Sequence, residues 1–158
     1  MHLAGGDQPL GQGDWQQLWL AAGHSPYPCR DRALLQLFWH LGPTVVAALA
    51  LRLDQIDFAT SRICATGTGG DGIAMPPEVL RALTTYVSLE RPAKCGSTLF
   101  VGRHGRPLRP AAVDRAFRAM SAAGGVTADP RRLRRQALLR QLLARPVATL
   151  RGLRRCGA

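Results

Sequence analysis

The sequence predicts a mainly α-helical domain with a small three-stranded antiparallel sheet inserted into it. Three observations predict this class. Most of the chain carries apolar residues at helical spacing. A stretch between residues 53 and 76 instead alternates over short runs that turn residues interrupt, as strands do. A length of 158 residues fits one domain, and we expect a short leader with one helix over 1–29 and a main region over 30–158.

Caps and stop signals place the helices. Asp14 followed by Gln17 resembles a capping box at the start of the first helix, and Gly23 is its stop. Gly42 ends the second helix, and Pro76-Pro77 begin the helix that follows the strands. The expected helices cover residues 15–22, 30–41, 44–51, 76–89, 111–123 and 130–143, with a last short one after Pro146.

The three strands are expected at Ile56–Phe58, at Arg62–Ala65 and over 73–76, with a glycine-rich tip between the second and the third. This tip contains Gly67-x-Gly69-x-x-Gly72, which matches the dinucleotide-binding pattern. That pattern requires a helix to begin at its third glycine. A proline pair follows closely instead, and proline cannot lie inside such a helix. A hairpin tip is therefore the favoured interpretation.

Positive charge is concentrated in the last third of the chain. The net charge is +11, and all basic residues except Lys94 are arginines. Residues 1–100 hold 7 basic and 8 acidic side chains, whereas residues 101–158 hold 14 arginines against Asp114 and Asp129 alone. Arginine-rich coding bias is the alternative explanation, and it explains the count better than the segregation. A one-sided basic field of this size favours a polyanionic partner.

The sequence gives little support for a metal site, a disulfide framework or a membrane-spanning segment. The cysteines at 29, 64, 95 and 156 are far apart and form no C-x-x-C pair, so we expect thiols in a reducing cytoplasm, no metal site and no cofactor. The longest apolar run, over 45–51, is too short to span a membrane. His40 lies in an apolar helix, where a core residue is a simpler interpretation than a catalytic base. The tryptophans are interpreted as packing residues, with base stacking as the alternative.

The helix over 130–143 carries the main functional signal. Asp129 is a suitable N-cap and Pro130 suits the first helical position. Its first turns hold four arginines, at the end where the helix dipole disfavours cations. They are Arg131, Arg132, Arg134 and Arg135.

A bound phosphate would explain this placement, because free N–H groups and guanidinium groups both bind anions. The alternative is a solvent-exposed basic patch whose arginines form ion pairs with carboxylates elsewhere in the chain. Only two acidic residues occur in the last 58 positions, which makes such pairing hard to arrange. Further along the same helix the leucines occupy several faces, which predicts a largely buried helix. They are Leu138, Leu139, Leu142 and Leu143.

Five segments in order resemble the tyrosine recombinases, the family of phage integrases and chromosome-dimer recombinases. The resemblance covers the chain from Arg30 onwards. The segments are R-D-R-A-L-L-Q-L-F-W-H-L-G at 30–42, A-L-R-L-D-Q-I-D-F at 50–58, G-T-G-G-D-G-I-A-M-P-P-E at 67–78, L-F-V-G-R-H-G-R-P-L at 99–108 and P-R-R-L-R-R-Q-A-L-L-R-Q-L-L at 130–143. The resemblance implies the catalytic-domain fold of that family, without its separate N-terminal DNA-binding domain.

The resemblance also implies where catalytic groups would lie. In the family, two arginines clamp the scissile phosphate, a lysine and a histidine assist, and a tyrosine attacks. Arg134 matches the second arginine, whereas the first aligns with Thr44. The lysine aligns with Thr68, the histidine with Arg131, and a later Gly-His pair with Gly157-Ala158. Tyr27 and Tyr86 lie in the wrong part of the chain for the nucleophile, which a C-terminal truncation would have removed.

We therefore expect a DNA-binding remnant or homologue of a site-specific tyrosine recombinase, without activity of its own. Arg134 is the one matching catalytic position, and the four arginines at 131, 132, 134 and 135 are the expected DNA contacts. The alternatives are a non-catalytic DNA-binding regulator or accessory partner of an active recombinase, and a relic too unstable to fold. The expected partner is the DNA phosphate backbone, and the expected state is a monomer.

Overall fold

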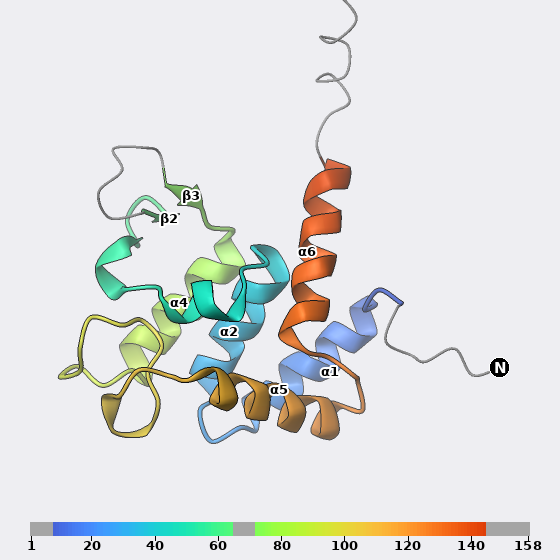
Figure 1. The fold of residues 1–158 in the computed structure, drawn as a ribbon, viewed down its shortest axis with the longest axis horizontal. Helices are drawn as coiled ribbons and strands as arrows, with labels where there is room; N and C mark the ends of the chain where they lie inside the picture. Colours follow the sequence, from blue (N-terminus) through green and yellow to red (C-terminus); the bar gives the residue numbers. More distant parts are fainter. Residues whose placement is uncertain (1–7, 65–71, 145–158) are drawn as a thin grey trace, which may run out of the picture.

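The computed structural model describes residues 8–64 and 72–144, and these fold into a helical domain with one small sheet (Figure 1). The longer helices are α1 (Gln12–Gly23), α2 (Pro28–His40), α4 (Pro77–Leu89), α5 (Pro110–Gly124) and α6 (Pro130–Ala144). A short α3 (Val45–Leu49) and the 3-10 turns η1 (Leu53–Gln55) and η2 (Arg103–Gly105) connect them. The predicted fold class is confirmed. The helix expected after Pro146 lies outside the described residues.

Helix α2 forms the centre of the core and contacts α1, α4 and α6. Its side chains from Ala33 to Phe38 are all buried, and the Phe38 ring meets Phe117 of α5 edge-on at 5.7 Å between centroids. On the other side of the core, Tyr86 of α4 stacks on Phe100 at 5.6 Å. The Tyr86 hydroxyl accepts a hydrogen bond from the Val101 N–H at 3.0 Å, so its polar end is satisfied inside the core.

The sheet is antiparallel in the order β1 (Ile56–Asp57), β2 (Arg62–Ile63) and β3 (Ile73–Ala74). Ile63 pairs with both Ile56 and Ile73, which fixes the register. The antiparallel pairing of β2 with β3 is the pairing that the predicted hairpin requires. Its tip, with Thr68, lies outside the described residues.

The first helix begins earlier than its sequence indicates. Gly11 is the N-cap, and the Gly11 N–H donates to the Asp14 carboxylate at 2.9 Å. Asp14 therefore occupies the third helical position and closes the cap from inside, which corrects its expected role as the N-cap itself. Leu18 and Ala22 of this helix are fully buried, so α1 belongs to the same core as the rest of the domain.

The prediction that the leucine-rich helix is largely buried was wrong. Only Pro130, Leu133 and Ala137 of α6 are buried. Exposure rises along its second half, from 39% at Leu138 to 85% at Leu143. Figure 1 shows the reason, because α6 stands upright beside α2 and its C-terminal half extends past the other helices. Within the described part of the chain, no neighbouring element covers the leucines there.

No helix of the described residues is long and apolar enough to cross a membrane. Within the same ranges, no group of histidine, cysteine or acidic side chains gathers with metal-binding geometry, and the thiols of Cys29, Cys64 and Cys95 are free.

Candidate DNA-binding cleft

A glycine allows α6 to approach the end of α2. Gly42 follows α2 with a φ of +60°, a conformation that favours glycine. A Cβ built on Gly42 would lie 2.8 Å from the Ala137 Cβ and 3.2 Å from the Arg134 carbonyl oxygen. The segment after α2 therefore packs directly on the α6 backbone, and Thr44 comes close to the first turns of α6.

This approach forms a cleft of about 650 Å³ that we call the Thr44 cleft. Its walls are the start of α3, the start of α5 and the start of α6. It is lined by Pro43, Thr44, Val45, Val46, Pro110, Asp114, Asp129, Pro130, Arg131 and Arg134. Two of the four arginines predicted to contact DNA thus share one cleft with Thr44. Thr44 lies some 90 positions earlier in the sequence than these arginines.

Thr44 has a clear structural role in this cleft. It is the N-cap of α3, and its hydroxyl oxygen accepts a hydrogen bond from the Ala47 N–H at 3.1 Å. Its side chain is exposed, so an arginine at this position would reach solvent or a ligand without entering the core. The resemblance expects that arginine here, and Thr44 carries no positive charge in its place.

The N-terminus of α6 is capped as predicted. The Asp129 carboxylate accepts a hydrogen bond from the Arg132 N–H at 2.9 Å, so one free N–H of the first turn is satisfied internally. Arg131 is exposed and Arg134 is half-buried, and both line the cleft.

The structure gives Arg132 protein partners instead. Its guanidinium group donates to the carbonyl oxygens of Thr127 and Gln8. It therefore ties the segment before α1 to the loop before α6. Arg135 is exposed and does not line the Thr44 cleft.

Both acids of the basic third line the Thr44 cleft. Asp114 comes from α5 and Asp129 from the α6 cap. In the described residues neither carboxylate forms an ion pair with Arg131 or Arg134. The cleft nevertheless holds two positive and two negative side chains. Its formal charge is close to neutral, a balance that the counts of charged residues alone did not indicate.

Side chains further along α6 dock it on α2. The Arg140 guanidinium lies 4.2 Å from the centroid of the Trp39 ring and donates to the Trp39 carbonyl. The Gln141 amide donates to the His40 carbonyl at 3.3 Å. Trp39 in turn meets Trp15 at 4.5 Å between centroids. The interpretation of the tryptophans as packing residues is confirmed for this contact, and Arg140 is a docking residue that the sequence did not single out.

His40 is half-buried at the end of α2, and its burial lowers the pKa of its imidazole below the usual value. Glu78 acts in the opposite direction, and the nearby Arg140 cation lowers the pKa further. The lowered pKa of His40 favours its neutral imidazole. It does not line the Thr44 cleft, which fits a structural residue.

The arrangement is that of a tyrosine-recombinase catalytic domain: a helical domain with a small sheet, in which the turn after a central helix meets the arginine-bearing start of a later helix. A solved structure, the crystal structure of XerA recombinase, shares this fold with a TM-score of 0.71 over 90% of this chain and 58% of its own, at 21% sequence identity. Residues 10–149 match the phage integrase family, and the chain belongs to that family.

Curated relatives agree with this assignment. The tyrosine recombinase XerC of Chromobacterium violaceum is 31% identical over 116 residues, which cover 71% of this chain and 39% of that protein. The tyrosine recombinase XerC of Azotobacter vinelandii is 37% identical over 89 residues, which cover 53% of this chain and 29% of that protein. The chain therefore spans less than half the length of these relatives. The match from residue 10 also includes α1, which the sequence resemblance from Arg30 onwards had left out.

Proposed function

We propose that this chain is a DNA-binding homologue of site-specific tyrosine recombinases that holds duplex DNA by its phosphates and does not cleave a strand by itself. The observation that carries the proposal is the Thr44 cleft. It unites Arg134, the one arginine that matches a catalytic position of the family, with Arg131 and with position 44. These are the positions at which the family resemblance expects a phosphate.

The chemistry of the cleft supports a phosphate ligand. Arg134 offers a planar guanidinium group that can donate two parallel hydrogen bonds to phosphate oxygens. Arg131 adds a second, exposed guanidinium group on the same helix turn. The start of the 15-residue helix α6 supplies a favourable dipole for an anion. Its backbone contributes little more, because Pro130 has no N–H and the N–H groups of Arg132 and Leu133 are already bonded to Asp129. Asp114 and Asp129 oppose anion binding, so we expect the affinity of this cleft to be modest.

The same cleft lacks groups that strand cleavage requires. Transesterification at phosphorus needs a positioned nucleophile and dense positive charge around the developing phosphorane. Thr44 offers a hydroxyl group that already caps α3. Neither tyrosine of the chain lines the cleft, since Tyr86 is buried in the core and Tyr27 packs under Arg30. We therefore propose binding without cleavage.

The loss of one clamp arginine with the fold and the cleft retained also favours a second role, that of a non-catalytic regulator or accessory partner of an active recombinase. This role predicts discrimination between DNA sequences beyond charge attraction, measured as a ratio of affinities at physiological salt. We propose that the chain acts in the cytoplasm. For the free protein we propose a monomer, which sedimentation velocity over a concentration series checks against self-association through the exposed leucines of α6.

The binding proposal is tested by titrating duplex DNA over a salt series. We expect an affinity that falls linearly on a log–log plot, with a slope that counts the neutralised phosphates. Arg134→Ala is compared with Arg81→Ala, which removes the same charge from an exposed position on α4. Equal effects of the two variants would contradict a phosphate contact at Arg134.

The absence of cleavage is tested with nicked suicide DNA substrates that trap a covalent protein–DNA adduct. The expected result is no adduct under conditions where the protein binds the same DNA. A covalent adduct would contradict the inactivity, and mapping the attached residue would identify the nucleophile.

A further inference from the structure

A second cleft lies on the other flank of α5, between that helix, the end of α1 and the loop before α2. It has a volume of about 580 Å³, and we call it the alanine groove. Its α5 side presents Ala112, Ala116, Ala119 and Ala123, whose spacing places them along one face of the helix. Ala21 of α1, Leu108 and Met120 extend this apolar floor. The Thr44 cleft takes Pro110 and Asp114 from the opposite flank of α5.

One wall of the alanine groove is electrically balanced and held firmly. The Arg30 guanidinium forms an ion pair of 2.9 Å with the Asp31 carboxylate, and both side chains are buried. The Ser25 hydroxyl donates to the same carboxylate at 2.7 Å, and the Tyr27 ring lies 4.2 Å from the Arg30 guanidinium carbon. This network carries no net charge. The wall can therefore contact a ligand by complementary shape but attracts a charged ligand only weakly.

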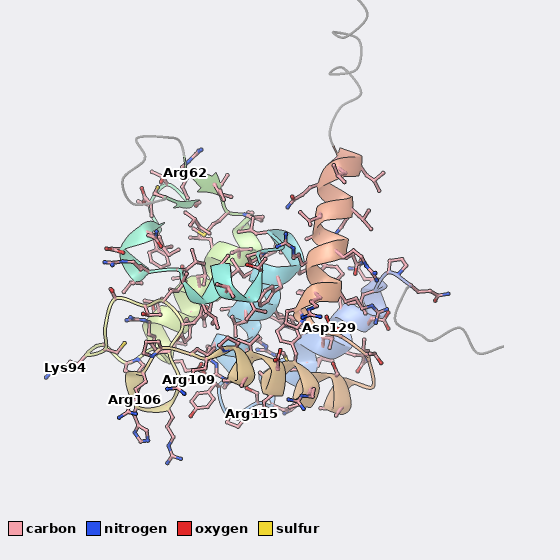
Figure 2. All side chains as sticks on the ribbon, viewed as in Figure 1. Arg62, Lys94, Arg106, Arg109, Arg115 and Asp129 are labelled. Atoms are coloured by element: carbon pink, nitrogen blue, oxygen red, sulfur yellow. The ribbon has the colours of Figure 1, made fainter. Side chains whose placement is uncertain are left out.

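The other wall is strongly basic. It holds four exposed arginines, and the described residues supply no ion pair or hydrogen-bond acceptor to any of their side chains. They are Arg103, Arg106, Arg109 and Arg115. Figure 2 shows that Arg106, Arg109 and Arg115 follow one edge of the molecule, along the segment before α5 and α5 itself, while Asp129 lies apart at the start of α6. Among the described residues, no carboxylate other than the paired Asp31 lines the groove.

We propose that the alanine groove binds an acidic amphipathic helix of a partner protein. Such a helix would place apolar side chains on the alanine floor and carboxylates against the arginine wall. The small side chains of the floor let a second helix approach closely. The apolar floor favours a protein partner over DNA, because the charged sugar–phosphate backbone offers less apolar surface than a leucine-bearing helix face to cover alanine, leucine and methionine side chains. Charge complementarity selects an acidic partner.

The test uses a synthetic helical peptide of about 15 residues, a length near the limit at which isolated helices become stable, with leucines on one face and glutamates on the other. The comparison peptide has the same composition in scrambled order. We expect the amphipathic peptide to bind the full chain, and the scrambled peptide to bind about tenfold more weakly since it presents no apolar face. Calorimetry in moderate salt measures both affinities. Equal affinities would overturn the proposal, since charge alone would then explain binding.

Two matched pairs of variants locate the site. Ala119→Phe fills the groove without changing charge, whereas Ala122→Phe adds the same side chain on α5 outside it. Arg109→Ala/Arg115→Ala removes charge from the wall, whereas Arg81→Ala/Arg118→Ala removes equal charge elsewhere. We expect a loss of about tenfold from the first member of each pair and little change from the second. Circular dichroism confirms that each variant is folded, and equal effects within either pair would overturn the proposal.

Duplex DNA and self-association are the remaining arms of the test. If duplex DNA displaces the peptide and Ala119→Phe weakens DNA binding, the groove is a nucleic-acid site and the proposal fails. If the chain self-associates and Ala119→Phe abolishes that, a second copy is the occupant and the proposal also fails. The DNA-binding proposal for the Thr44 cleft is tested by Arg134→Ala, so the two proposals can fail independently.

Discussion

The two clefts on either side of α5 differ in how they use charge. The Thr44 cleft combines two arginines with two aspartates, and its backbone geometry depends on a single glycine. The alanine groove has four exposed arginines without ion-pair partners among the described residues, above an apolar floor. The larger charge density therefore lies away from the positions that match the family's phosphate site. We therefore assign the proposed ligands, a phosphate and a protein segment, from the whole surface of each cleft and not from charge alone.

The largest expected effect comes from Gly42→Ala, which should damage the Thr44 cleft and spare the groove. A left-handed φ costs an alanine about 1–2 kcal/mol. The new methyl group must also displace Ala137 and the Arg134 backbone, and overpacking of this kind costs about 1–3 kcal/mol more. Denaturant unfolding measures the loss of stability. DNA affinity should fall with it because Thr44 and Arg134 move apart.

Gly125→Ala is the matched control. Gly125 has a φ of +64°, close to that of Gly42, but apart from its chain neighbours nothing lies within 4 Å of the position that a Cβ would take. This variant should lose only the backbone part, about 1–2 kcal/mol. If both variants lost the same stability, the close approach of α6 to Gly42 would contribute nothing.

Arg134→Ala is expected to weaken binding of duplex DNA several-fold and to lower the slope of the salt dependence by about one. The effect stays modest because Arg131 shares the cleft. Arg134→Lys keeps the charge but loses the planar pair of donors, and it should recover the slope more completely than the affinity. Recovery of both to the same extent would show that Arg134 acts as a point charge.

Asp114→Asn tests whether the acidic side chains of the Thr44 cleft weaken DNA binding there. Removing this carboxylate should strengthen DNA binding about threefold at low salt, the scale expected for one exposed charge. Glu78→Gln makes the same change of charge at an exposed position on α4 and should have a smaller effect. An unchanged affinity for Asp114→Asn would place the bound phosphate away from α5.

The smallest effect is expected from the titration of His40, which lies at the end of α2 where α6 docks. Its pKa is lowered in the folded protein, mainly by burial, so the unfolded chain binds the proton more readily. The contribution of His40 to the free energy of unfolding is therefore fully present above its pKa in the unfolded chain. This contribution is lost as pH falls below about 6.5. His40→Gln should lose less stability than the wild type when pH falls from about 7.5 to about 5.5. Equal losses would mean that His40 titrates alike in both states.

Local signals in the sequence predicted much of this fold. Asp129 and Pro130 predicted the start of α6, and apolar residues at helical spacing predicted α2, in which Leu34, Leu37 and Phe38 are buried. The pairing of Thr44 with Arg134 followed from the family resemblance, because residues so far apart carry no local signal of contact. Tertiary geometry decided the rest. Arg132 is engaged by two carbonyl groups, and the last leucines of α6 extend beyond their neighbours.

The alanine groove could not be predicted from the sequence. Its floor combines Ala21 with a face of α5 that begins some 90 positions later, and alanines in a helix are also typical of a plain solvated surface. In the sequence, the arginines of its wall appeared only as part of the excess of basic residues in the last third of the chain. Which arginines face an apolar floor depends on how α1 and α5 pack, and the composition holds no record of that packing.

We propose that DNA phosphates bind in the Thr44 cleft although the groove on the other flank of α5 is more basic. The most direct test is an NMR titration of the labelled chain with duplex DNA at physiological salt, which compares the amide shifts of the two flanks. We expect the largest changes at Thr44, Arg131 and Arg134, and loss of those changes in Arg134→Ala. Changes confined to Arg103, Arg106, Arg109 and Arg115 would contradict it.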